Sequence, residues 1–339
     1  MAPWFFHKVR LDHKTEDLSA VTPYEKVCWF LKHQFPWQGE GPVTFADTGI
    51  PPDFPADLRI VSVGDLLYQG VEYRLDAFLP QWRERFGEAL RIGNLETPLA
   101  LSRPPSTPRS IVHFNASPTF WDQIQAMGFH VLSVANNHAF DMGEDGLRET
   151  CARLEEAEVL PIGSSLVPRD TLEWRGRRVG FLATTYGTNR EPFLPTVDRF
   201  PSWRPDAERF LPPVLDRIRA LRERSDLVVL AMHWGHECET HLDPRLRDFA
   251  LAFVEAGADL VLGHHPHVAQ PSEKVTRADG SEALVLHSQG NFVCRGIHPL
   301  VRTGYAFDIR VALDGGRTRI AYDVHKVRTR RLTMKTRFL

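Results

Sequence analysis

The sequence predicts an α/β fold, in which short buried strands alternate with helices. Short apolar runs rich in β-branched residues recur from Arg59 onward, and stretches with apolar residues at helical spacing separate them. Glycines such as Gly128 and Gly257 stand where a helix is expected to end before the next strand. This alternation argues against a helical bundle and against an all-β sandwich.

The apolar runs are too short for buried helices and lack a polar face, so they are typical of strands that are covered on both sides. Helices are expected where Leu147, Cys151 and Leu154 share one face, and over 214–221 and 246–253. The predicted strands cover 60–63, 131–134, 179–182, 227–230 and 260–262.

Two further segments define the expected domain organisation. Residues 1–57 mix aromatic residues with a Pro- and Gly-rich stretch, which indicates an N-terminal extension. Residues 58–339 are expected to form one large domain. It ends in a hairpin, because alternating apolar residues over 307–313 and 320–324 flank Gly315 and Gly316.

Composition gives few signs of a macromolecular or membrane partner. The net charge is -2 and the isoelectric point about 6.7, so no general field attracts nucleic acid or an anionic membrane. Charged residues from Lys8 onward leave no apolar core for a signal peptide, and no apolar run reaches membrane-spanning length. The basic tail 326–337 lacks interleaved aromatic residues. We therefore expect a cytoplasmic protein that binds neither nucleic acid nor membranes.

Polar residues that can bind metals follow several of the predicted strands. The carboxyl ends of strands in an open α/β sheet share one edge, so groups far apart in sequence can meet there. Asp65 follows the first strand and His233 follows the strand over 227–230. The other strand ends carry Asn136, Asn137 and His138, then His264, His265 and His267; Glu96 adds a carboxylate.

These residue types together indicate a metal site. Carboxylate, imidazole and amide oxygen suit one or two divalent ions of manganese, iron or zinc. Taken alone, Asp65 is typical of a turn, Asn136 and Asn137 of a helix cap, and His233 of a buried histidine. Their occurrence at successive strand ends favours a shared site, in which Asp65 is the natural ligand to bridge two ions.

The order of these motifs resembles the CapA proteins of poly-γ-glutamate capsule biosynthesis, which are relatives of the calcineurin-like metallophosphoesterases. The resemblance covers about residues 59–295. The motifs that carry it are Gly64-Asp65, Asn94-Leu95-Glu96, Ala135-Asn136-Asn137-His138 with Asp141, His233-Trp234-Gly235 with Glu237, Gly257-Ala258-Asp259, Gly263-His264-His265-Pro266-His267 and Gly290-Asn291-Phe292.

The resemblance implies a four-layer α/β/β/α sandwich with two mixed sheets, and a CapA-like metallophosphatase domain over 58–339. His138 would protonate the leaving group, oriented by Asp141, since an imidazole titrates near neutrality. The implied metal ligands are Asp65, Glu96, Asn137, His233, His265 and His267.

Other polar residues of these segments are candidates for substrate contacts. Arg295 is one of them because its guanidinium can bind an anionic group with two hydrogen bonds, although a solvated surface arginine is its simpler interpretation. The candidates are Asn94, Asn136, His236, Glu237, His264, Asn291 and Arg295.

Two functions remain open on this basis. The first is a hydrolase that uses metal-activated water to cleave a phosphoester or an amide of a small or peptide-like anionic substrate. The second is a non-catalytic metal-binding accessory protein that serves a biosynthetic partner enzyme. Leu67 favours the second, because many metallophosphoesterases have histidine there. The presence of His138 and Asp141 favours catalysis, since a scaffold needs no proton donor.

Overall fold

The computed structural model describes residue 31 and residues 43–110, 113–190, 195–202, 204, 206–296, 298–330 and 334–339. Most of the expected extension over 1–57 lies outside these ranges. No helix in the described ranges is both long and apolar enough to cross a membrane.

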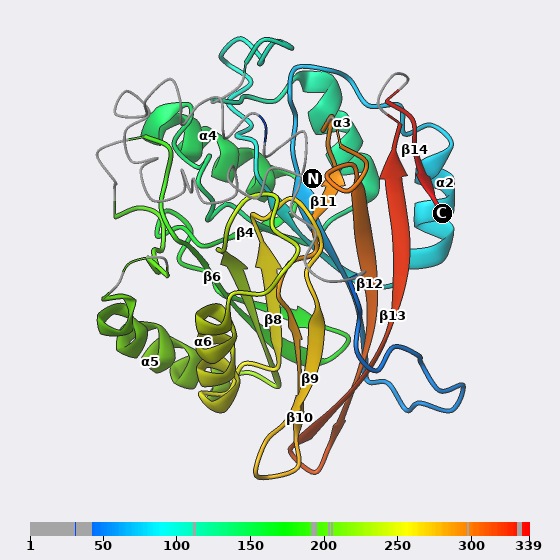
Figure 1. The fold of residues 1–339 in the computed structure, drawn as a ribbon, viewed down its shortest axis with the longest axis vertical. Coiled ribbons are helices and arrows are strands. Elements are labelled where there is room, and N and C mark those ends of the chain that lie inside the picture. The colour runs from blue at the N-terminus through cyan, green and yellow to red at the C-terminus, as the bar shows by residue number, and fades with distance from the viewer. Residues whose placement is uncertain are drawn as a thin grey trace.

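Two mixed β-sheets form the centre of the molecule (Figure 1). The first has eight strands in the order β14-β13-β12-β1-β2-β3-β4, and β11 pairs in parallel with the end of β1. Strands β1 to β4 run parallel to one another, whereas β12 and β13 are antiparallel to their neighbours. The strands are β1 (Leu58–Leu66), β2 (Leu90–Leu95), β3 (Val131–Ser133), β4 (Leu160–Ile162), β11 (Asn291–Val293), β12 (Thr303–Asp314), β13 (Arg317–Thr329) and β14 (Thr336–Phe338).

The second sheet has six strands in the order β5-β6-β7-β8-β10-β9. Its central strands β6, β7, β8 and β10 are parallel, and β5 and β9 close the edges in the antiparallel direction. The strands are β5 (Thr171–Trp174), β6 (Arg177–Thr185), β7 (Leu227–His233), β8 (Leu260–His264), β9 (Ser272–Thr276) and β10 (Glu282–Leu286).

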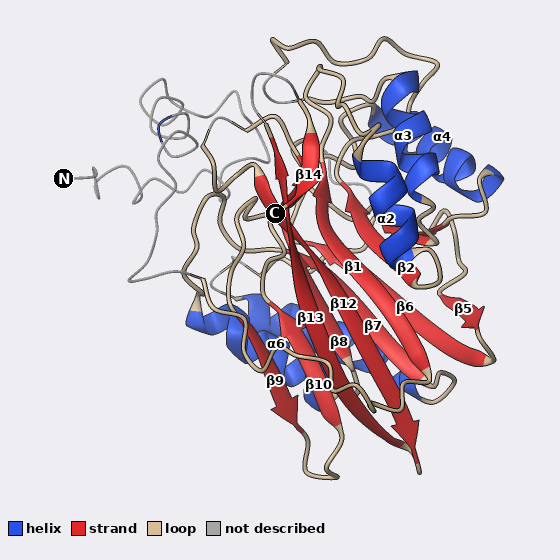
Figure 2. Ribbon diagram, turned by 90° about the vertical axis from the view of Figure 1, so that its right-hand side faces the viewer, coloured by secondary structure: helices blue, strands red, loops and turns tan. Residues whose placement is uncertain are grey.

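Helices cover the outer face of each sheet, so the molecule has four layers (Figure 2). Helices α2 (Phe78–Phe86), α3 (Pro118–Met127) and α4 (Gly143–Glu156) pack on the eight-stranded sheet. Helices α5 (Leu211–Arg222) and α6 (Pro244–Glu255) pack on the six-stranded sheet, and a short 3-10 helix, η4 (Ala207–Phe210), precedes α5. The predicted four-layer α/β/β/α sandwich with two mixed sheets is confirmed.

Strand β7 shows why the sequence builds this arrangement. Side chains of a strand alternate between its two faces. Val229 and Ala231 belong to the apolar core between the sheets, whereas Val228 and Leu230 belong to the core beneath α5 and α6. A strand covered on both faces must be apolar at every position, which explains the continuous apolar run. The prediction that this run is a strand buried on both faces is confirmed.

The predicted helices and the hairpin are also present. Ser117 caps α3, since its Oγ accepts a hydrogen bond from the backbone of Phe120 at 3.0 Å. Gly128 ends that helix in the left-handed conformation, with φ of 64°. Strands β12 and β13 form an antiparallel hairpin whose turn contains Gly315 and Gly316, both at positive φ.

The segment 287–291 approaches both sheets closely where β1 and β8 end. A Cβ atom at Gly64 would lie 1.7 Å from the carbonyl oxygen of Gly290, and one at Gly263 would lie 1.9 Å from that of His287. Only glycine permits these approaches. They bring the segment that carries Asn291 against the strand ends.

We therefore expect Gly64→Ala to destabilise the protein by about 3 kcal/mol, because the contact is with backbone that must shift. Urea unfolding measures this difference. Gly187→Ala is the matched control, since a Cβ there would meet no atom within 4 Å, and its expected effect is below about 0.5 kcal/mol. Equal stability of the Gly64 variant and the wild type would contradict the described approach.

Candidate metal centre

The predicted ligands come from both sheets and meet at the carboxyl ends of their strands. Asp65 lies in β1 and Glu96 directly follows β2, both in the eight-stranded sheet. His233 ends β7, and His265 and His267 follow β8 in the six-stranded sheet. All five side chains are buried, with exposures between 0% and 5%. Residues that lie up to 202 positions apart thus share one interior site.

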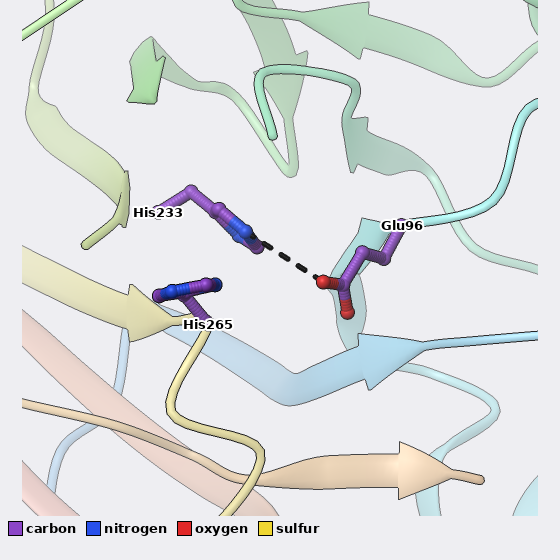
Figure 3. Close-up of side chains that lie close together, drawn as sticks. All are labelled: Glu96, His233 and His265. Atoms are coloured by element: carbon purple, nitrogen blue, oxygen red, sulfur yellow. Dashed lines mark ion pairs between the residues drawn. The ribbon is translucent and has the colours of Figure 1, made fainter. Parts of the chain in front are cut away.

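Among the residues that the structure describes, three sets of side chains lie close enough to hold a cation. In each set one ligand atom per residue lies within 4.8 Å of those of the others. The sets share members, because Glu96, His265 and His267 each belong to two of them. Figure 3 shows the first set, with the imidazole of His233 directed at the carboxylate of Glu96. The sets are Glu96-His233-His265, Asp65-Glu96-His267 and Glu237-His265-His267.

Glu96 is the strongest indication that these residues suit a cation. Its side chain is fully buried, and neither carboxylate oxygen accepts a hydrogen bond from any described residue. Oε1 lies 3.6 Å from Nε2 of His233, and Oε2 lies 3.7 Å from Nδ1 of His267. Burial raises the pKa of Glu96 well above its usual range, and the nearby Asp65 raises it further. A buried carboxylate whose two oxygens accept no hydrogen bond is energetically costly, and a bound cation would remove that cost.

Asp65 and His267 form an ion pair in the site. Oδ2 of Asp65 lies 3.4 Å from Nδ1 of His267. Burial alone would lower the pKa of His267, but the carboxylates of Glu96 and Asp65 outweigh it and raise that pKa to about 10. Burial alone would raise the pKa of Asp65, but His267 and His264 hold it below its usual value. A metal that binds His267 must therefore displace a proton.

His233 is neutral by contrast. Burial lowers its pKa well below the usual range, and the neighbouring histidines lower it further. Its Nε2 lies 2.9 Å from Oδ1 of Asn137, so the predicted amide ligand stands beside the imidazole. The ring of Tyr186 packs against that of His265, with centroids 4.7 Å apart.

Three asparagines that the sequence suggested as substrate contacts hold the ligands and their backbone in place. Nδ2 of Asn94 donates to Oδ1 of Asp65 at 2.8 Å. Asn136 donates to the carbonyl oxygen of Leu95 at 2.9 Å, next to Glu96. Side chains of this kind orient ligands and tune their basicity.

The third of these asparagines, Asn291, contacts both the backbone and the imidazole of His267. Nδ2 of Asn291 donates to the carbonyl oxygens of His267 at 3.2 Å and Val301 at 2.9 Å. Its Oδ1 therefore faces Nδ1 of His267, at 3.0 Å.

The loop after β8 has an unusual backbone. His265 and His267 adopt positive φ angles of 95° and 58°, although both carry a Cβ. Each such residue costs of order 1–3 kcal/mol, and this conformation is typical of functional sites. It directs two imidazoles, separated by Pro266, toward one interior point.

His138 and Asp141 form a pair beside the ligands. Nδ1 of His138 lies 2.6 Å from Oδ2 of Asp141, and that oxygen also accepts the backbone N–H of Phe114 at 2.7 Å. Asn189 also contacts this ring, with Nδ2 3.3 Å from Nδ1 and 3.4 Å from Nε2 of His138. The sequence carries no signal for the roles of Asn189 and Phe114, because neither ends a strand nor belongs to a recognisable motif.

The remaining predicted residues lie at different places around the site. Glu237, a predicted substrate contact, belongs to one of the three sets that can hold a cation. His264 is buried, and its Nε2 contacts Val63 and Gln289 inside the protein. Nε2 of His236 lies 4.0 Å from Asp243 at the start of α6. Arg295 is half-buried and donates to the carbonyl oxygen of Pro108 at 3.0 Å.

The position two residues after Asp65, which many metallophosphoesterases fill with histidine, is apolar here. Leu67 is buried and packs in a small cluster beside the ligands that includes Cys238, Val268 and Cys294. Burial raises the pKa of the Cys294 thiol to about 12, so this thiol stays protonated and is a poor ligand.

Comparisons with known proteins agree with the resemblance. The family model described as bacterial capsule synthesis protein PGA_cap matches residues 57–295. The chain is 28% identical over 206 residues to the PGA biosynthesis protein CapA of Bacillus subtilis, which covers 59% of this chain and 52% of that protein. It is 29% identical over 212 residues to a probable polyglutamine synthesis accessory protein of Mycobacterium tuberculosis, which covers 57% and 56%. The chain spans about half the length of the curated relatives it matches.

Among solved structures, the chain is similar to a novel phosphatase from Mycoplasma pneumoniae. The match covers 79% of this chain and 93% of that one, with a TM-score of 0.49 and 12% sequence identity. The family assignment does not depend on this likeness, because the family model alone covers well over half of the chain. The predicted relationship to CapA proteins is confirmed, and the chain belongs to the PGA_cap family of bacterial capsule synthesis proteins.

Proposed function

We propose that this protein is a metal-dependent hydrolase that cleaves a phosphoester or an amide of an acidic, peptide-like substrate. The observation that carries this proposal is the buried Glu96 carboxylate, whose two oxygens have no hydrogen-bond donor among the described residues and face His233 and His267. The oxygens face different histidines, so Glu96 would hold a cation together with His233 or with His267. Manganese, iron and zinc fit these ligands.

Bound divalent ions would polarise the scissile group and make a water molecule easier to deprotonate. The residues of the chain supply the remaining steps. Asp141 accepts the proton on Nδ1 of His138 and so fixes the orientation of the ring. Nε2 of the protonated imidazole can then donate a proton to the leaving group. Asn189 packs beside the ring and limits its rotation.

An arginine beside the pair of His138 and Asp141 suits an anionic substrate. Arg190 is exposed, and its guanidinium donates to the carbonyl oxygen of Asp141 at 3.0 Å. Arginine binds carboxylate and phosphate groups with two parallel hydrogen bonds. Both a phosphoester and a polyglutamate-like chain carry such groups. The cytoplasmic setting expected from the sequence is part of this proposal.

A second candidate is a non-catalytic accessory role in the synthesis of an acidic polymer. The name of the Mycobacterium tuberculosis relative describes an accessory protein, and Leu67 occupies a position that often carries a metal ligand. The hydrolase is favoured because an accessory role would not require the buried pair of His138 and Asp141.

Metal analysis of the purified protein, followed by hydrolysis assays, tests the two candidates. The substrates are a generic phosphodiester, a phosphomonoester and a γ-glutamyl amide, and Asp65→Ala serves as the metal-deficient comparison. Metal-dependent turnover of any of them by the wild type supports the hydrolase. Bound metal without turnover, together with Asp65→Ala and His138→Ala variants that still support polymer synthesis, supports the accessory role. A wild type that binds no divalent metal overturns both.

A further inference from the structure

Glu237 is a buried carboxylate at the edge of the candidate metal centre. It follows β7 by four residues and is 9% exposed. Its carboxylate lies close to the imidazoles of His265 and His267, because one ligand atom of each of the three residues lies within 4.8 Å of those of the others. The three side chains therefore form a set that can hold a cation.

The balance of charge in the site favours a third carboxylate ligand. Two divalent ions would bring four positive charges into a buried volume, whereas Asp65 and Glu96 supply two negative ones. Histidine and asparagine ligands are neutral when they bind a metal. A buried group of ions is stable only if its charges are nearly balanced. Glu237 supplies the third negative charge within reach of the same histidines.

The backbone directs this side chain inward. Gly235 has φ of 89° and Cys238 has φ of 60°, so the chain turns sharply on both sides of Glu237. The backbone N–H of Cys238 donates to the carbonyl oxygen of Pro266 at 2.8 Å. That hydrogen bond joins the loop after β7 to the loop that carries His265 and His267, so the three ligands lie on two connected loops.

We propose that Glu237 is a direct ligand in the metal centre and completes it together with His265 and His267. This inference rests on the proposed function, since it requires that the centre binds metal. It changes the part assigned to Glu237 from substrate contact to metal binding. Metal affinity in the absence of substrate therefore distinguishes the two roles.

The experiment measures Mn²⁺ bound per chain by equilibrium dialysis and mass spectrometry of the apo protein, with no substrate present. We expect Glu237→Gln to lose one equivalent of Mn²⁺ or to bind it at least about 100-fold more weakly. Removing a group that only orients a ligand typically costs roughly 10–100-fold. Glu237→Asp keeps the charge on a shorter side chain and is expected to fall between Glu237→Gln and the wild type.

Glu239→Gln is the matched control. Glu239 lies two residues further along the same loop, is 2% exposed, and belongs to none of the ligand sets among the described residues. Its variant is expected to bind Mn²⁺ like the wild type. Unfolding midpoints in EDTA show whether each variant is folded, and Mn²⁺–Mn²⁺ coupling in the electron paramagnetic resonance spectrum reports the paired ions directly.

The outcomes separate this inference from the function on which it rests. If the wild type binds two ions and Glu237→Gln binds them equally well, while Asp65→Ala loses them, Glu237 is not a ligand but the metal centre stands. If the wild type binds no Mn²⁺, Zn²⁺ or Fe²⁺, the metal centre itself is wrong. If Glu237→Gln is unfolded in EDTA, the Mn²⁺ affinity of the folded Glu237→Asp variant is compared with that of the wild type. Equal affinities overturn the inference, and weaker binding by the variant supports it.

Discussion

Replacing Glu96 with glutamine is expected to stabilise the metal-free protein and to abolish its stabilisation by metal. Without metal, the fully buried carboxylate has no hydrogen-bond donor among the described residues, so a neutral amide of the same shape costs less. We expect a gain of about 1–3 kcal/mol in the free energy of unfolding in EDTA. With metal in roughly thousandfold excess over its dissociation constant, the wild type gains about 4 kcal/mol and the variant gains little.

The gain in EDTA should depend on pH in a definite direction. Burial raises the pKa of Glu96 well above its ordinary value of 4.5. A raised pKa in the folded state gives stability that is fully present below the unfolded pKa and is lost as pH rises. The advantage of Glu96→Gln over the wild type is therefore smallest near pH 5 and grows toward pH 8.

Urea unfolding with EDTA and with Mn²⁺ measures both effects. Glu273→Gln is a suitable comparison, because Glu273 is a partly buried carboxylate paired with His287 at 2.8 Å, outside the ligand sets. Its variant should be less stable than the wild type by the same amount in both conditions. A Glu96→Gln variant that Mn²⁺ stabilises as strongly as the wild type would remove Glu96 from the metal centre.

Replacing His138 with alanine is expected to lower kcat by about 10²–10⁴-fold, with metal content unchanged. The imidazole is the only group in our proposal that gives a proton to the leaving group, and it belongs to none of the ligand sets. The measurement compares kcat and KM on whichever substrate the wild type hydrolyses, alongside metal content. The KM should change little, because proton donation acts in the transition state.

Asp141→Asn tests the orientation of this imidazole. The amide can direct its nitrogen at Nδ1 and so favour the wrong tautomer, which lowers kcat and changes the pH profile while the metal stays bound. If His138→Ala lost metal in proportion to activity, the residue would belong to the metal centre. An unchanged kcat would exclude it as the proton donor.

Much of the fold and of the convergence of the site could be predicted from the sequence. The apolar run of β7 indicates a strand covered on both faces. In the four-layer arrangement the other sheet covers one face of β7, and α5 and α6 cover the other. Asp65 and His233 were expected to meet because each ends a buried strand. They do so across two sheets rather than along one edge, since the parallel strands of both sheets end on the same side of the sandwich.

The tasks of individual polar residues could not be predicted in the same way. Asn94 and Asn291 lie in the motifs, but whether an amide faces substrate or a neighbouring ligand depends on side-chain direction, which spacing does not give. Asn189 comes four residues after β6 and reaches His138 only through the loop conformation. The inward direction of Glu237 depends on positive φ angles at its neighbours, which a cysteine at 238 does not suggest.

The position of the centre between the two sheets has a mechanical consequence. Asp65 and Glu96 belong to one sheet and the imidazoles to the other, so any cation held by both kinds acts as a cross-link between the two sheets. Slow separation of the sheets must then break coordinate bonds as well as apolar contacts. Chelation should consequently speed amide hydrogen exchange in the central strands of both sheets together, whereas strands far from the seam keep their rates.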